Sequence, residues 1–133
     1  MKDILSVLQG KTDFYFLPGA SNKSIEEAEQ LLSVKFTDEY KEYARHFGAM
    51  SSSDHELAGV CASPRLNIVD VTLEERENNP YLTKKAYVIE QLNIDDLVVW
   101  QSESGDIFLT AANTKPYKLY DSLREYLIAL EQE

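Results

Sequence analysis

The sequence predicts an α+β domain with a mostly antiparallel sheet of about four to six strands, and with helices packed on one face and at both termini. Three observations support this prediction. Amphipathic helix patterns occur towards both ends of the chain, strand patterns follow one another between them, and a short glycine-containing turn joins two of these strands. The length of 133 residues, without internal repeats or a linker, predicts one domain over residues 1–133.

The first segment of the chain is predicted to hold a short helix and an apolar run. Residues 2–9 predict the helix, which Gly10 ends. Its apolar positions are Ile4, Val7 and Leu8. The run Phe14–Gly19 ends in a Pro-Gly turn signal and predicts either a short edge strand or an arm laid across the core.

Two short amphipathic helices follow. Ser24 and Glu27 form a capping box that predicts the start of the first helix. Its buried positions are predicted to be Ile25, Ala28 and Leu32. Thr37 is the predicted N-cap of the second helix, and Gly48 is predicted to end it in a left-handed conformation. The buried positions of that helix are predicted to be Tyr40, Tyr43, Ala44 and Phe47.

The second half of the chain is predicted to hold most of the sheet. After a polar loop at 49–55, strand signals occur at 56–60, 86–90, 97–101, 107–110 and 117–120. Residues 66–71 predict an extended segment, and a capping box of Thr72 and Glu75 predicts a short helix that ends before Pro80. Asp121 or Ser122 caps the last helix. The apolar positions of this helix are Leu123, Tyr126, Leu127 and Leu130.

The order of these motifs resembles the SUKH superfamily, which includes fungal cell-wall-assembly regulators and bacterial immunity proteins. The matching segments are Ala28-Glu29, Phe36–Tyr40, Gly48, Glu56–Gly59, Thr72–Arg76 and Glu125–Leu127. Thr37 stands where the family usually has proline. The resemblance covers the chain from about Pro18 to the end, and it implies an intracellular immunity protein that binds and neutralises a toxin domain, often a nuclease.

Charge and composition restrict the possible partners. The net charge of −10 argues against direct nucleic-acid binding, which requires a basic surface. An acidic surface can instead steer a basic protein partner, although it also serves solubility. No apolar run approaches the length of about 20 residues that a membrane span needs. The N-terminus lacks signal-peptide features, and a single cysteine, Cys61, suits a reducing compartment, so we expect a cytoplasmic protein without membrane contact.

The sequence offers few residues for catalysis. His46 is expected in the last turn of a helix, and Cys61 is expected to pack as a small apolar residue. Asp54, His55 and Glu56 are adjacent on a predicted strand, where neighbouring side chains point to opposite faces and do not favour a shared metal ion. The glycines form no phosphate-binding loop. We therefore expect no catalytic residue, no metal ion and no cofactor.

Five residues are candidates for partner binding. The loop and edge carboxylates Asp54, Glu56, Glu103 and Asp106 could meet a basic partner, or they could serve only turn formation and solubility. Trp100 could anchor a partner or cover the sheet within the core. The expected partner is a cognate toxin, which could be a basic nuclease domain, and the chain itself is expected to be a monomer or a weak homodimer. A regulatory scaffold and a small-ligand-binding domain are the alternative functions.

Overall fold

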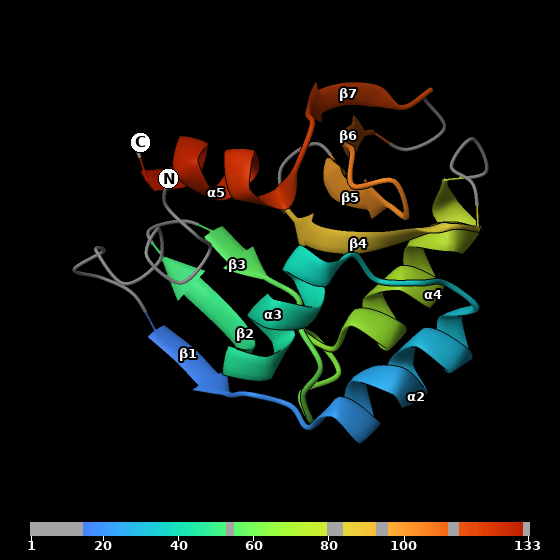
Figure 1. Ribbon diagram of the computed structural model, residues 1–133. Helices are drawn as coiled ribbons and strands as arrows, with labels where there is room; N and C mark the ends of the chain where they lie inside the picture. Colours follow the sequence, from blue (N-terminus) through green and yellow to red (C-terminus); the bar gives the residue numbers. More distant parts are fainter. Residues whose placement is uncertain (1–14, 53–54, 80–83, 93–95, 112–114, 132–133) are drawn as a thin grey trace.

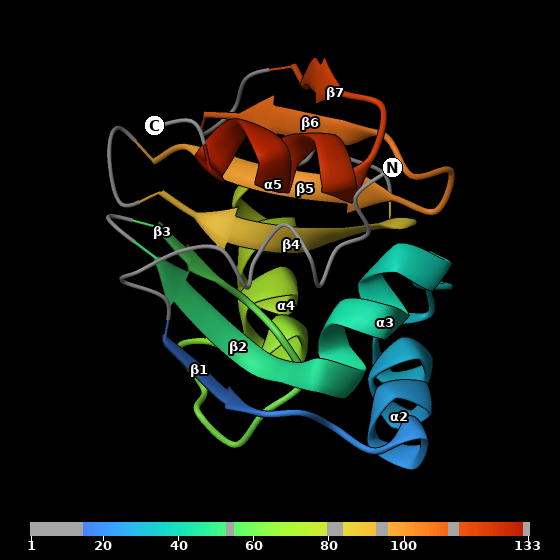
Figure 2. The ribbon, with the colours of Figure 1, turned by 60° about the vertical axis from the view of Figure 1, so that its left-hand side comes forward.

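The described part of the chain folds into one antiparallel sheet with four helices packed around it (Figures 1 and 2). The computed structural model describes residues 15–52, 55–79, 84–92, 96–111 and 115–131, so the helix predicted at 2–9 lies outside the described residues. The elements in chain order are β1 (Tyr15–Pro18), α2 (Asn22–Leu32), α3 (Asp38–His46), β2 (Phe47–Ser52), β3 (His55–Leu57), α4 (Ile68–Asn78), β4 (Ala86–Gln91), β5 (Val98–Ser102), β6 (Ile107–Thr110), β7 (Tyr117–Tyr120) and α5 (Leu123–Glu131).

The seven strands pair in the order of the sequence, and every neighbouring pair is antiparallel. The predicted α+β class and antiparallel sheet are therefore confirmed, with seven strands in place of about four to six. The apolar run at the start forms the edge strand β1, the first of the two alternatives that the sequence left open. Among the described residues, every helix is too short or too polar to cross a bilayer.

The helices cover both faces of the central strand β4. Glu90 accepts a hydrogen bond from the hydroxyl of Tyr126 on α5, whereas the next residue, Gln91, donates one to Glu75 on α4. Because successive strand residues point to opposite faces, α5 and α4 lie on opposite sides of β4, as Figure 2 shows. This arrangement refines the expectation that the helices share one face.

The N-cap of helix α2 lies three residues before Ser24, the N-cap that the sequence predicts. This N-cap is Ser21, whose hydroxyl accepts a hydrogen bond from the backbone N–H of Ser24 at 3.1 Å. The prediction that Ser24 starts the helix is therefore wrong, because Ser21 already covers the free N–H group at this end. The predicted apolar positions Ile25, Ala28 and Leu32 are all buried.

Helix α3 begins as predicted but ends differently. The Thr37 hydroxyl accepts a hydrogen bond from the N–H of Tyr40, and Asp38 and Glu39 occupy the first turn. The helix ends at His46, and the chain continues directly into β2, so Gly48 is not a left-handed stop. The predicted loop at 49–55 is thus largely strand.

Gly48 and Gly59 are required by a close backbone approach. A Cβ atom on Gly59 would lie 2.0 Å from the carbonyl oxygen of Gly48, which is far inside van der Waals contact. A Cβ atom on Gly48 would lie 2.4 Å from the carbonyl oxygen of Pro18. Three segments that are distant in the sequence therefore cross where only glycine leaves enough room.

Helix α4 begins at Ile68 with Asn67 as its N-cap, not at Thr72. The Asn67 side chain accepts hydrogen bonds from the N–H groups of Val69 and Asp70, so the capping box predicted at Thr72 is wrong. Thr72 is instead buried, and its hydroxyl accepts a hydrogen bond from the N–H of Val88 in β4. This residue joins α4 to the sheet.

The core is rich in aromatic side chains with satisfied polar atoms. Tyr40 and Tyr87 are buried and have ring centroids 5.2 Å apart. The hydroxyl of Tyr40 donates to the carbonyl oxygen of Ala58, and that of Tyr87 donates to Gln101 Oε1. Ser122 accepts a hydrogen bond from the N–H of Glu125 and thus caps α5, one of the two residues predicted for this role.

Candidate partner-binding surface

The carboxylates predicted for partner binding are already engaged within the chain. Arg65 donates two hydrogen bonds to Glu56, at 2.6 and 2.9 Å, and these contacts lower the pKa of the Glu56 carboxyl. Glu103 accepts a hydrogen bond from the backbone N–H of Lys35 at 2.8 Å. Asp106 lies 3.4 Å from the Lys118 ammonium group. Each of these contacts competes with the cations of another protein for the carboxylate.

The predicted residues also do not form one group. Leu57, next to Glu56, pairs with Glu90 near the end of β4, whereas Ser102, next to Glu103, pairs with Ala86 at the start of β4. Glu56 and Glu103 therefore lie towards opposite ends of this strand. Asp54 lies outside the described residues.

Trp100 belongs to the core. Its side chain is fully buried in β5, and its indole N–H donates to the Thr110 hydroxyl at 3.0 Å. A buried ring with a satisfied N–H cannot contact a partner on the surface, so the partner-binding role considered for Trp100 is corrected to a structural one.

A buried polar cluster joins β3, β4 and α5. Glu90 is 1% exposed and accepts hydrogen bonds from the Tyr126 hydroxyl and from the N–H of Glu56, and His55 Nδ1 lies 3.0 Å from one of its oxygens. Burial raises the pKa of the Glu90 carboxyl, while the contacts with Tyr126 and His55 act in the opposite direction. These contacts hold three elements together, which is a structural role for Glu90.

The remaining residues considered for chemistry lie apart. His46 ends α3, and its Nδ1 lies 3.0 Å from the carbonyl oxygen of Glu42. Cys61 is half-buried after β3, and its thiol lies 3.8 Å from the carbonyl oxygen of Ser63. In the described part of the chain, no three His, Cys, Asp or Glu side chains are placed to hold a metal ion.

A different acidic surface lies on α2 and α4, two helices that contact each other (Figure 1). Its carboxylates are Glu27 on α2 and Asp70, Glu74 and Glu77 on α4, all of them exposed. None of the four forms an ion pair with another described residue. Two large apolar side chains are exposed on the same helices, Leu31 at 67% and Leu73 at 45%. We refer to these six residues as the α2–α4 surface.

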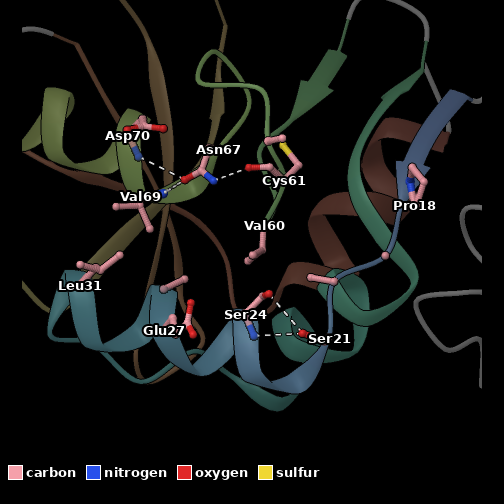
Figure 3. Close-up of a pocket in the computed structure, with 14 residues that line it drawn as sticks. Pro18, Ser21, Ser24, Glu27, Leu31, Val60, Cys61, Asn67, Val69 and Asp70 are labelled. Atoms are coloured by element: carbon pink, nitrogen blue, oxygen red, sulfur yellow. Dashed lines mark hydrogen bonds between the residues drawn. The ribbon is translucent and has the colours of Figure 1, made fainter.

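An open cleft of about 620 Å³ lies at the end of this surface where both helices begin (Figure 3). Ser24, Glu27 and Leu31 form its wall on α2, because positions three and four residues apart share one side of a helix. The opposite wall consists of the start of α4. The residues that line this second wall are Asn67, Val69 and Asp70.

The cleft is closed at its far side by the ends of two strands. Pro18 is the last residue of β1, while Val60 and Cys61 come shortly after β3. The Asn67 side chain fixes this arrangement, since its amide donates to the carbonyl oxygen of Cys61 at 2.6 Å while its oxygen accepts from Val69 N–H at 2.8 Å. The cleft is therefore formed by elements with defined hydrogen bonds.

The sequence gives no sign that Glu27 and Asp70 belong to one site. Glu27 belongs to a predicted helix cap, and Asp70 lies in a segment that the sequence predicts to be extended. The signal that could have found Asp70 is Asn67, a good N-cap residue directly before an apolar helix pattern. Their proximity, however, depends on the packing of α2 against α4.

A comparison with models of known protein families found a match to this chain. The family model SUKH_5, described as SMI1-KNR4 cell-wall, matches residues 1–130. A comparison with curated proteins found no match.

Proposed function

The chain belongs to the SUKH superfamily, and on this premise we propose that it is an immunity protein that binds a toxin domain and neutralises it by covering a basic active site. The observation that supports this proposal best is the α2–α4 surface. It combines four carboxylates that have no ion-pair partner among the described residues with two exposed leucines.

This combination suits a protein partner with a basic surface. A nuclease domain must carry cations where it holds the phosphates of its substrate. Carboxylates without internal partners keep their full attraction for such cations, and they accelerate association through long-range steering. The exposed Leu31 and Leu73 provide apolar area, which the centre of a protein interface needs. No chemistry by this chain is required, because coverage alone blocks the phosphate-binding groove.

We assign the main role to the α2–α4 surface rather than to the carboxylates first considered. A partner cation that approaches Glu56 would compete with Arg65, and one that approaches Asp106 would compete with Lys118. Competition of this kind cancels part of the gain from the new contact. Glu27 and Asp70 face no such competition, since no ion pair joins either of them to a described residue.

Co-expression with a toxin domain encoded beside the gene for this chain tests the proposal. We expect the chain to form a complex with that domain and to restore growth of the host. The variant E27K/D70K should bind at least about 10-fold more weakly, and its binding should depend less on salt concentration.

The matched control is E26K/D38K. It changes the net charge by the same amount, and its two carboxylates, also exposed, lie at comparable positions, one on α2 and one in the first turn of a helix. This control should bind within about 3-fold of the original chain, because a change in net charge alone acts weakly at physiological salt. Equal losses in both variants, or no protection by the original chain, would contradict the proposal.

A further inference from the structure

We infer that the cleft between α2 and α4 seats a lysine or arginine side chain of the partner, on a partner segment that also carries an apolar residue. This inference rests on the proposed function, because the segment is taken to belong to the bound protein. The cleft has the lining that such a side chain needs, and its charge favours a cation over an anion.

The walls of the cleft match the two parts of a long basic side chain. Val60, Val69 and Leu31 contribute aliphatic surface, Glu27 lies on the α2 wall, and Asp70 lies at the rim of the opposite wall, at the start of α4 (Figure 3). Lysine and arginine combine an apolar stem with a charged end, so they gain from aliphatic walls and carboxylates together. The volume of about 620 Å³ exceeds that of one side chain, which leaves room for a neighbouring apolar residue against the exposed Leu31.

The charges around the cleft favour a cation over an anion. None of the described residues that line it is basic. Helices α2 and α4 both begin at the cleft, where free N–H groups would attract an anion. Here Ser21 accepts from the N–H of Ser24, and Asn67 accepts from the N–H groups of Val69 and Asp70, so these donors are already used. The Asp70 carboxylate in the first turn of α4 further offsets the positive end of that helix.

The chain contains its own probe for this cleft. Cys61 is the single cysteine of the sequence, it lines the cleft, and it is half-buried. The rate at which its thiol reacts with a disulfide reagent reports both the local charge and the access to the cleft. We compare a negatively charged reagent (Ellman's reagent) with a neutral one (4,4′-dithiodipyridine). The ratio of their two rates does not depend on the fraction of Cys61 that is thiolate, because that fraction affects both rates equally.

The first measurement tests the charge of the cleft. In the variant E27Q/D70N, we expect the ratio of the two rates, charged reagent over neutral reagent, to rise about 3-fold or more, because the negative reagent is no longer repelled. The control E26Q/D38N should leave this ratio unchanged, since neither residue lines the cleft. An unchanged ratio in E27Q/D70N, or an equal rise in both variants, would overturn the inference.

The second measurement tests the occupant. A blocked peptide of alternating leucine and arginine, at millimolar concentration, should slow the reaction of Cys61 with the neutral reagent about 3-fold or more. The same peptide with citrulline, a neutral analogue of arginine, should give no protection. Equal protection by both peptides, or none by either, would overturn the inference.

The failure of this inference can be told apart from the failure of the proposed function. If a toxin domain binds and E27K/D70K weakens it, but the arginine peptide does not protect Cys61, the function holds and the cleft is not the anchor. If the arginine peptide protects Cys61 but no toxin domain is bound, the cleft assignment holds and the immunity function fails.

Discussion

Replacement of Tyr87 by phenylalanine should destabilise the chain more than the same change at Tyr40 or Tyr43, two other buried tyrosines whose hydroxyls form hydrogen bonds to the backbone. Two strong hydrogen bonds hold the Tyr87 hydroxyl. It accepts from the N–H of Thr37 at 3.0 Å and donates to Gln101 Oε1 at 2.8 Å. The ring itself packs against Phe36 and Tyr40 and is retained in phenylalanine.

The magnitude follows from the number of hydrogen bonds. Each contributes about 1 kcal/mol, and the N–H of Thr37 loses its acceptor, so Y87F should lower the free energy of unfolding by about 2–3 kcal/mol. In Y40F only the bond to the carbonyl oxygen of Ala58, 2.8 Å long, is lost, which should cost about 1 kcal/mol. Y43F removes a longer contact of 3.3 Å to the carbonyl oxygen of Leu57 and a hydrogen bond with the backbone of Met50, so its cost should be about 1–2 kcal/mol, below that of Y87F.

Urea unfolding followed by far-ultraviolet circular dichroism measures these differences, with slopes that should stay unchanged. Burial raises the pKa of all three hydroxyls, so they stay protonated and the order of the variants should be the same at pH 6 and pH 9. Binding of the partner should be unaffected in all three variants, because none of the three residues lines the cleft. A loss in Y87F no greater than in Y40F would refute the reasoning from hydrogen bonds.

Three further predictions concern other contacts of the fold. Burial raises the pKa of Glu90, so the folded chain holds this proton more tightly than the unfolded chain. The stability from this group is complete below about pH 4 and is lost as the pH rises through the raised pKa. Relative to E90Q, the original chain should therefore lose stability in unfolding titrations as the pH rises above about 4, and a difference that does not vary with pH would contradict this. Arg76 donates to two backbone carbonyl oxygens, at 2.9 and 2.7 Å, so R76A should lower the free energy of unfolding by about 2 kcal/mol in urea. R65A breaks an exposed ion pair and should lower it by less than about 1 kcal/mol; equal losses in the two variants would contradict this prediction. G59A places a Cβ atom 2.0 Å from the carbonyl oxygen of Gly48. Thermal unfolding should therefore show that the free energy of unfolding falls by about 3 kcal/mol or more, and a variant as stable as the original chain would exclude the close approach.

The helix and turn boundaries that the sequence predicted well depend on residues that are close together in the sequence. Thr37 caps α3 through the N–H of Tyr40, three positions later, and any chain with this local sequence can form that bond. The hairpin of β5 and β6 turns at Gly105, whose φ of 101° favours glycine. The boundaries that were wrong at Ser24 and Thr72 each had a competing cap residue nearby, Ser21 and Asn67, and the local pattern did not decide between them.

The glycines show a second reason why the sequence does not predict some features of the fold. Gly48 has the position of a helix stop in the sequence, yet it lies in β2 because the chain at Gly59 passes close to its carbonyl oxygen. No local signal reports a contact between residues that are so far apart in the chain. The burial of Trp100 is likewise not visible in the local sequence. Strand alternation shows which residues lie on the same face of the sheet as Trp100, but not that other elements cover this face.

By itself, the sequence determined the α+β class, most of the strands, the apolar stripes of α2, α3 and α5, and the acidic charge, because these properties depend on composition and on short-range periodicity. The tertiary structure alone decided which carboxylates are already paired and which remain available. Arg65 reaches Glu56 and Lys118 reaches Asp106 only in the folded chain, and α2 comes to lie against α4 so that Glu27 and Asp70 line one cleft. Ion pairs and clefts depend on distances between side chains, and packing sets those distances between residues that the sequence keeps far apart.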